Sequence, residues 1–317
     1  MKTLLITRPL PDAVLSAARA EFHVTVRLNN LPMQPDELRD ALRNFDLVLP
    51  TLGDKFDAAV FADVTSPKCK LLANFGVGYN HIDVEAARRA GVAVSNTPGA
   101  VTDATADVAM TLMLMSARRA GEGERLARSG QWKGWHPTQM LGLHVSGKTV
   151  GIAGMGRIGQ AIAQRCHYGF GMDVKYWNRS EKVLSHPAER IEDLAELAAQ
   201  VDILVSAVPG GASTHHLFDA AIFAAMQPHA HFINIARGEV VREAALIAAL
   251  QDQRIAGAGL DVYEFEPKVP DTLRKLDNVT LLPHLGTAAL EVRTEMGLMA
   301  VDNLVAFATG NTAPNCL

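Results

Sequence analysis

Short apolar runs alternate with alanine-rich stretches of helical periodicity along most of the chain. Runs of β-branched and aliphatic residues are typical of buried strands, and amphipathic alanine-rich stretches are typical of the helices that cover them. Because the two kinds of segment alternate, the pattern predicts parallel sheets wrapped in helices. The most apolar helix is expected from Thr102 to about Arg119.

Two groups of strands are predicted, separated by this helix. The first group is Thr3–Thr7, His23–Val26, Leu47–Pro50, Leu71–Asn74 and Ala93–Ser95, with helices at Ala13–Glu21 and Pro35–Phe45. The second group is Thr149–Ala153, Asp173–Trp177, Ile203–Val208, His231–Ile235, Gly257–Leu260 and Val279–Leu282. The number and spacing of the second group fit a complete doubly wound nucleotide-binding sheet.

The fold class expected is therefore α/β, with two doubly wound parallel-sheet domains of Rossmann or flavodoxin type and an active-site cleft between them. A final helix at Leu290–Ala308 is expected to pack back on the first domain. We expect a discontinuous first domain at 1–98 plus 287–317 and a second, nucleotide-binding domain at 99–286. A long connection, Gly121 to His144, interrupts the pattern and is predicted to be a loop that is either functional or an oligomer arm at about 120–145.

Composition and charge indicate a globular protein and argue against nucleic-acid-binding and membrane-spanning classes. Hydrophobic content of 48% and charged content of 20% are ordinary for a globular protein. A net charge of -4 with scattered basic residues argues against nucleic-acid binding, and no apolar run is long enough to span a membrane. The start of the chain has the character of a strand and not of a signal peptide, and we expect a cytoplasmic protein.

The spacing of the cysteines and histidines along the chain does not indicate a metal site. The three cysteines, Cys69, Cys166 and Cys316, are isolated, which suits a reducing compartment. Two histidine groups, His215-His216 and His229-Ala230-His231, lack helical spacing and a neighbouring acid in the sequence, so we interpret them as surface histidines.

A glycine loop follows the strand Thr149–Ala153 and opens a helix at Ile158–Cys166. Its residues are Gly154, Met155, Gly156, Arg157, Ile158 and Gly159. In this context the first glycine permits a tight turn, the second lets the backbone approach a pyrophosphate, and the third lets helix and strand pack closely. The loop predicts a dinucleotide whose diphosphate lies at the positive end of the helix dipole.

Cofactor choice is expected at the end of the following strand, where Asn178, Arg179 and Ser180 stand. An acid there would bind the ribose 2′-hydroxyl of NAD, but this chain has an amide followed by a guanidinium and a hydroxyl. The missing acid favours NADPH, with NADH as the weaker alternative.

Three further residues follow predicted strands of the same sheet. Arg237, Glu266 and His284 supply a guanidinium, a carboxylate and an imidazole in glycine- or proline-punctuated segments. Arginine binds a carboxylate with a bidentate fork, histidine supplies a proton, and glutamate holds the imidazole in its charged form. Parallel strands end at one edge, so we expect these side chains to form one catalytic site for reduction of a 2-oxo acid.

These segments resemble the signature motifs of the D-2-hydroxyacid dehydrogenase family. The similarity covers nearly the whole chain, including the segments Asn74–Asp83 and Asn96–Gly99, and from Gly151 to Cys316 it is greatest to the glyoxylate/hydroxypyruvate reductase branch. That branch also reduces 2-ketoaldonates. The family's members are usually dimers joined through the cofactor domain.

The resemblance implies a role for each matching residue. His284 is the acid/base, Glu266 its partner and Arg237 the substrate clamp. The backbone amides of Val77 and Gly78 hold the substrate carboxylate, and Trp135 walls the pocket of a partner subunit or anchors the dimer. The remaining cofactor-binding positions it implies are Thr105, Val208, Pro209, Ala236, Asp261 and Gly286.

Several alternatives stay open at this stage. Reduction of 2-ketogluconate or of an aromatic 2-oxo acid is one, because pocket size depends on Leu52, Met140 and the loop around Trp135. A non-catalytic dinucleotide-sensing scaffold or corepressor is an alternative of another class, against which the three catalytic residue types count. The sequence leaves the hydride stereochemistry unspecified.

Overall fold

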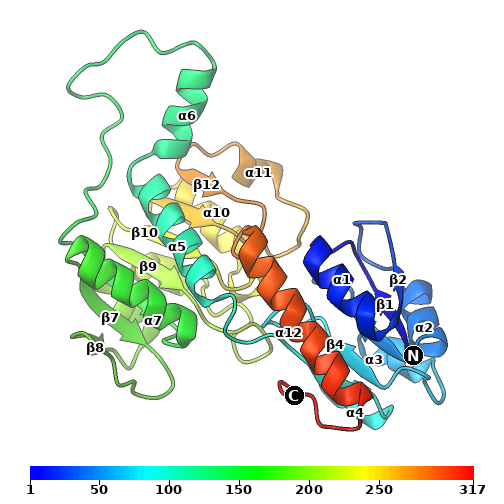
Figure 1. Ribbon diagram of the computed structural model, residues 1–317. Helices are drawn as coiled ribbons and strands as arrows, with labels where there is room; N and C mark the ends of the chain where they lie inside the picture. Colours follow the sequence, from blue (N-terminus) through cyan, green and yellow to red (C-terminus); the bar gives the residue numbers. More distant parts are fainter. The chain divides into compact units, whose positions relative to one another are not determined.

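The computed structural model describes all residues, 1–317, and divides into two compact units. The first unit is Met1–Val101 with Thr287–Leu317, and the second is Thr102–Gly286. Each is built on one parallel sheet (Figure 1). The two-domain parallel α/β fold predicted from the sequence is confirmed.

The first unit carries a five-stranded sheet in the order β2-β1-β3-β4-β5, the flavodoxin-like order. Its elements are β1 (Thr3–Ile6), α1 (Asp12–Glu21), β2 (His23–Val26), α2 (Pro35–Asn44), β3 (Leu47–Leu49), α3 (Ala58–Ala62), β4 (Leu71–Ala73), α4 (Val84–Arg89), β5 (Ala93–Ser95) and α12 (Leu290–Ala308). Although α12 comes from the end of the chain, it packs on α1 and β4 within this unit.

Side chains of this sheet alternate between two cores, as the period of a strand requires. Leu4 and Ile6 of β1 face α1 and α12, whereas Leu5 between them faces α2, α3 and α4. In β4, Leu72 shares the core of Leu5, whereas Leu71 and Ala73 share the core of Leu4 and Ile6. Both faces of the sheet are therefore buried. A sheet covered by helices on both sides exposes only its edges and strand ends, so polar chemistry is confined to the loops there.

The second unit carries a seven-stranded sheet in the order β12-β11-β10-β9-β6-β7-β8, again entirely parallel. Its elements are α5 (Thr102–Ala117), α6 (Ala120–Arg128), β6 (Thr149–Ala153), α7 (Arg157–Gln164), a π-helical turn (Arg165–Gly169), β7 (Asp173–Trp177), β8 (Glu189–Arg190), α8 (Leu194–Ala199), β9 (Ile203–Ser206), α9 (Ala220–Ala225), β10 (His231–Asn234), a 3-10 turn (Gly238–Val240), α10 (Glu243–Gln251), β11 (Gly257–Leu260), α11 (Asp271–Arg274) and β12 (Val279–Leu281). The order reverses between β6 and β9, which is the switch point where this fold binds its ligands.

Two elements depart from the sequence prediction. The segment predicted as a continuous loop contains the helix α6, whose glycines Gly121 and Gly123 lower its intrinsic helix propensity. Charged pairs such as Glu124–Arg128 stabilise it instead. The short strand β8 was not predicted, because two residues are too few to show a period.

The interpretation as surface histidines fits His215 and His229, which are exposed, but it is wrong for His231. His231 is only 5% exposed and hydrogen-bonds the Ser116 hydroxyl at 2.8 Å. His216 lies 2.6 Å from a carboxylate oxygen of Glu264, and His229 pairs with Asp202 at 2.7 Å. These acids come from distant parts of the chain, so sequence spacing could not find them.

No group of three or more histidine, cysteine or acidic side chains is placed to hold a metal ion. None of the helices combines the length and apolar character that crossing a membrane requires.

Candidate active site

Arg237, Glu266 and His284 belong to the second unit and follow three adjacent strands. Arg237 comes after β10, Glu266 after β11 and His284 after β12, and these strands are neighbours in the sheet. Because the sheet is parallel, all three residues stand at its carboxyl edge.

The imidazole and the carboxylate are in direct contact. Nδ1 of His284 donates to Oε2 of Glu266 at 2.9 Å, and the side chains are 29% and 31% exposed. The amide of Tyr263 donates to the other oxygen of Glu266 at 3.0 Å. Nε2 of His284 is thus the ring nitrogen left to exchange a proton with a bound molecule.

Electrostatics keep this carboxylate charged. Burial alone would raise the pKa of Glu266, but the hydrogen bond and charge of His284, the Tyr263 amide and the charge of Arg237 hold that pKa below its usual range. A carboxylate that stays ionised at neutral pH accepts the Nδ1 proton and fixes the orientation of the imidazole.

His284 has a backbone φ of 56°, in the left-handed region that non-glycine residues rarely adopt. Asp261 holds this conformation: its two carboxylate oxygens accept the amides of Leu285 at 2.6 Å and Gly286 at 2.8 Å. The hydroxyl of Thr105 donates to the carbonyl of Gly286 at 3.2 Å. Burial raises the pKa of Asp261, whereas the two amides and the charge of His284 oppose that rise.

Arg237 is partly buried and lies in a turn fixed by Asn234. The side-chain oxygen of Asn234 accepts the amide of Ala236, and its amide group donates to the carbonyl of Arg237, both at 3.1 Å. Burial lowers the pKa of the guanidinium, and the carboxylates of Glu266 and Glu239 raise it. An arginine beside two carboxylates keeps its charge, as a clamp for an anionic substrate must.

The space around each glycine of the loop shows whether a dinucleotide would fit there. Gly154 has a φ of 99°, and a Cβ there would lie 2.6 Å from the carbonyl oxygen of Ala207. A Cβ on Gly159 would overlap the carbonyl of Gly154. Around Gly156, by contrast, no atom lies within 4 Å of a Cβ position, so the backbone is open where a diphosphate would approach. The loop at the start of α7 therefore fits the group.

The residues expected to choose the cofactor lie beside this loop. The side chain of Asn178 accepts the amide of Met155 at 3.2 Å and donates to the carbonyl of Ser180 at 2.7 Å. Arg179 is exposed and forms no ion pair. The loop of Val208 and Pro209 follows β9 and is also adjacent, since Gly154 packs against its backbone.

The remaining candidates do not follow strands of the seven-stranded sheet. Val77 and Gly78 belong to the first unit, in the partly exposed loop after β4, and neither amide donates to another group of the chain. Trp135 is 78% exposed in the irregular segment between α6 and β6 (Figure 1). Trp132 in the same segment is 54% exposed.

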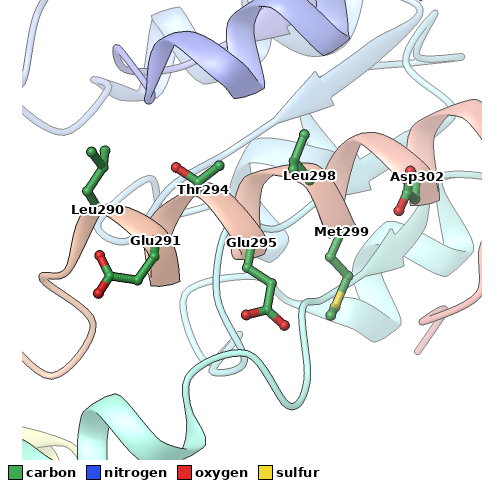
Figure 2. A pocket seen from close by; sticks show the side chains of 7 residues that line it. All are labelled: Leu290, Glu291, Thr294, Glu295, Leu298, Met299 and Asp302. Atoms are coloured by element: carbon green, nitrogen blue, oxygen red, sulfur yellow. The ribbon is translucent and has the colours of Figure 1, made fainter.

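A pocket on α12 has a different character. Figure 2 shows its side chains in two rows along the helix, Leu290, Thr294 and Leu298 in one and Glu291, Glu295 and Met299 in the other, with Asp302 beyond. Three acids and no cation would repel the carboxylate of a 2-oxo acid. This pocket is not the site of that chemistry.

Sequence reasoning missed the residues that hold the site in place. Asn234 and Tyr263 carry no motif of their own. Their only signal is a polar or aromatic residue at the end of a buried strand. Asn234 binds backbone groups of its own turn, whereas the amide of Tyr263 donates to Glu266 and its hydroxyl donates to the carbonyl of Leu282. These contacts become visible only in the folded chain.

A Rossmann sheet with a glycine loop at its switch point and an arginine, a glutamate and a histidine at its carboxyl edge defines a nicotinamide-dinucleotide-dependent oxidoreductase. Residues 110–286 match the model of the D-isomer specific 2-hydroxyacid dehydrogenase NAD binding domain. The chain belongs to the D-2-hydroxyacid dehydrogenase family, whose members act on CH–OH groups with a nicotinamide cofactor. The resemblance drawn from the sequence motifs is confirmed.

Relatives of known function cover almost the whole chain. A glyoxylate reductase of Thermococcus onnurineus is 41% identical over 317 residues, covering 98% of this chain and 94% of that protein. A glyoxylate/hydroxypyruvate reductase B of Klebsiella pneumoniae is 39% identical, covering 99% and 98%. The crystal structure of an NADPH-dependent glyoxylate/hydroxypyruvate reductase of Sinorhizobium meliloti, in complex with NADP and malonate, has a TM-score of 0.89 at 34% identity, covering 100% and 96%.

Proposed function

We propose that the protein reduces small 2-oxo acids, glyoxylate and hydroxypyruvate among them, to D-2-hydroxy acids with NADPH. The observation that carries the proposal is the contact of His284 Nδ1 with Glu266 Oε2 at 2.9 Å, beside the guanidinium of Arg237. The names of the relatives from Thermococcus onnurineus and Klebsiella pneumoniae support the same substrate class.

In this proposal each residue acts on one part of the substrate. A reduced nicotinamide, when bound, supplies the hydride that adds to the carbonyl carbon. His284 donates the proton from Nε2 to the carbonyl oxygen, so that the ketone becomes a hydroxyl. Arg237 binds the carboxylate and stabilises the charge that grows on the neighbouring oxygen. Glu266 orients the imidazole and stabilises its charged form, and the amides of Val77 and Gly78 hold the carboxylate.

Cofactor binding is assigned to the groups around the glycine loop. The amides at the start of α7 would hold the diphosphate, and Arg179 and Ser180 would hold a 2′-phosphate. The absence of an acid at Asn178 and the unpaired, exposed guanidinium of Arg179 support NADPH over NADH. Thr105, Asp261 and Gly286 would lie beside the nicotinamide, and Val208 and Pro209 beside the adenosine half.

The experiment is a turnover panel with the purified protein. Glyoxylate, hydroxypyruvate, 2-ketogluconate and phenylpyruvate are each assayed with NADPH and with NADH, following the loss of the reduced cofactor's absorbance. We expect the highest kcat/KM for glyoxylate or hydroxypyruvate with NADPH. A preference for phenylpyruvate or 2-ketogluconate would move the assignment to those substrates, and no turnover with any pair would contradict the proposal in favour of a dinucleotide-sensing role.

The proposal includes a homodimer joined through the second unit. Two exposed tryptophans in one irregular segment, Trp132 and Trp135, are a large apolar surface for a monomer to leave in water. Trp135 then either walls the partner's pocket or anchors the interface. Sedimentation of the wild type and of Trp135→Ala, with kcat measured at the same concentrations, separates these versions, because only the first predicts lost activity in an intact dimer. A fully active monomer would exclude the pocket-wall version.

A further inference from the structure

The loop after β4 has its carbonyl groups bound by asparagine side chains. The amide nitrogen of Asn74 donates to the carbonyl of Gly76 at 2.9 Å and to that of Gly78 at 3.1 Å. The amide nitrogen of Asn96, which follows β5, donates to the carbonyl of Val77 at 2.9 Å. Three successive carbonyls of the loop are therefore held by two side chains.

Holding these carbonyls also aims the amides. In a trans peptide the C=O and N–H groups point in opposite directions. The carbonyl of Gly76 shares its peptide with the amide of Val77, and the carbonyl of Val77 shares its peptide with the amide of Gly78. Both amides therefore point away from the asparagines, and neither donates to another group of the chain.

Both asparagines are themselves fixed. Asn74 has no exposed surface, and its side-chain oxygen lies 3.0 Å from Nε2 of His81. Because the nitrogen of that amide already donates twice, its oxygen must accept, and His81 is the donor. On the other side, Asn303 of α12 is completely buried and donates to the backbone carbonyl of Asn96 at 3.1 Å. The loop is thus braced from two directions within the first unit.

We propose that Asn74 and Asn96 are the positioning residues of the substrate-carboxylate site, aiming the amides of Val77 and Gly78, with His81 fixing the orientation of the Asn74 amide. This inference rests on the proposed function, in which those two amides bind the carboxylate. An unpaired donor pair on adjacent peptides forms a small anion-binding concavity. Its affinity depends on both peptide planes keeping their orientation.

The test compares donor-removing variants with donor-keeping ones. Asn96→Ala removes the donor to the Val77 carbonyl. His81→Met removes the donor to Asn74, whereas His81→Gln keeps one, so the pair separates the hydrogen bond from the volume of the side chain. Asn44→Ala, at the exposed end of α2, is the matched control.

The readouts are the glyoxylate KM and kcat, the dissociation constant of oxamate in the NADPH-bound protein, the dissociation constant of NADPH and the Tm. In Asn96→Ala we expect the glyoxylate KM and the oxamate dissociation constant to rise about tenfold or more, the scale of a hydrogen bond to a charged group. The NADPH dissociation constant stays at the wild-type value. His81→Met shows a smaller rise of the same kind, and His81→Gln and Asn44→Ala match the wild type.

A purely structural role would lower the Tm of Asn96→Ala and leave the two carboxylate constants unchanged. That result overturns the inference, and so do equal glyoxylate and oxamate constants for His81→Met and His81→Gln. The proposed function still stands in both cases if the wild type turns over 2-oxo acids. If the wild type binds oxamate but reduces no 2-oxo acid, the proposed function fails and the oxamate constants of the variants still decide the inference. If the wild type binds no oxamate, the inference fails, whatever the turnover.

Discussion

Asp261 and His284 are joined through the backbone, with the amide of His284 donating to the carbonyl of Asp261 at 3.0 Å. The side chain of Asp261 then accepts the next two amides, those of Leu285 and Gly286. Three consecutive peptides of the histidine loop thus depend on one residue at the end of β11. This bracing holds the left-handed backbone of His284, a conformation that costs about 1–3 kcal/mol and persists only where its surroundings fix it.

We therefore expect Asp261→Asn to lower kcat about tenfold or more. An asparagine offers one oxygen and one NH2 group, so one of the two amides faces another N–H and the loop shifts. A displaced imidazole is poorly aligned for proton transfer. Steady-state kinetics and a thermal melt check this. Wild-type kcat together with an unchanged Tm would show that the clamp is dispensable.

His284→Gln should lose at least about a hundredfold in kcat, since general acid catalysis contributes about 10²–10⁴. Its dissociation constant for NADPH should stay near that of the wild type, because the glycine loop is untouched. Stopped-flow turnover and a fluorescence titration measure the two quantities. Near-normal turnover in this variant would remove His284 from the proposed mechanism.

Glu266→Gln tests the role of the charge. The pKa of Glu266 lies below its usual range, so the carboxylate is ionised at neutral pH and protonates only in more acidic solution. The neutral variant lacks that charge at every pH and stabilises the protonated imidazole less. We expect the alkaline fall of the reduction rate to begin at lower pH than in the wild type. A pH–kcat profile identical to the wild type would reduce Glu266 to a structural role.

Arg237→Lys should raise the KM for the 2-oxo acid and lower kcat together, because a point charge cannot replace a planar bidentate fork. Arg242→Lys is the matched control, since that exposed arginine precedes α10 and makes no ion pair. Kinetics of both variants with the same substrate measure the difference. Equal effects at the two positions would argue against a clamp at Arg237.

Arg179→Ala tests the NADPH assignment. We expect the KM for NADPH to rise about tenfold, the scale of a charge-assisted hydrogen bond, and the KM for NADH to stay unchanged. NADH serves as the internal control in the same preparation. A parallel rise for both cofactors would place Arg179 on a group they share and not on the 2′-phosphate.

His231 predicts how stability depends on pH. Burial, and then the charge of His229, lowers the pKa of His231 from 6.5 to about 4. Between these values the unfolded chain binds the proton and the folded chain does not, so stability is complete above pH 6.5 and is lost as the pH falls toward 4. This pKa shift corresponds to a loss on the order of 3 kcal/mol in the free energy of unfolding.

The variant His231→Asn should flatten this dependence, because it keeps a polar group near Ser116 and cannot take up the proton. Urea unfolding at several pH values between neutrality and the acid range measures the free energy of unfolding of both proteins. The same acid slope in the variant would assign the loss to other groups.

The sequence by itself determined the two parallel-sheet domains and most strand positions, since buried parallel strands are continuous apolar runs and the period of their helices is local. The residue types at Arg237, Glu266 and His284 were visible too, because each follows such a strand. The helix α6 was not, since Gly121 and Gly123 hide it and charged pairs between its turns stabilise it.

Only the tertiary structure decided which groups hold the site. Asn234, Asn74 and Asn96 act on backbone carbonyls and amides, and Asp261 fixes the loop of His284 from another strand end. A backbone partner leaves no mark in the sequence, because every residue has the same carbonyl and nearly every residue the same amide. Within each unit the order of the strands brings these groups to their partners, and sequence spacing does not record that order.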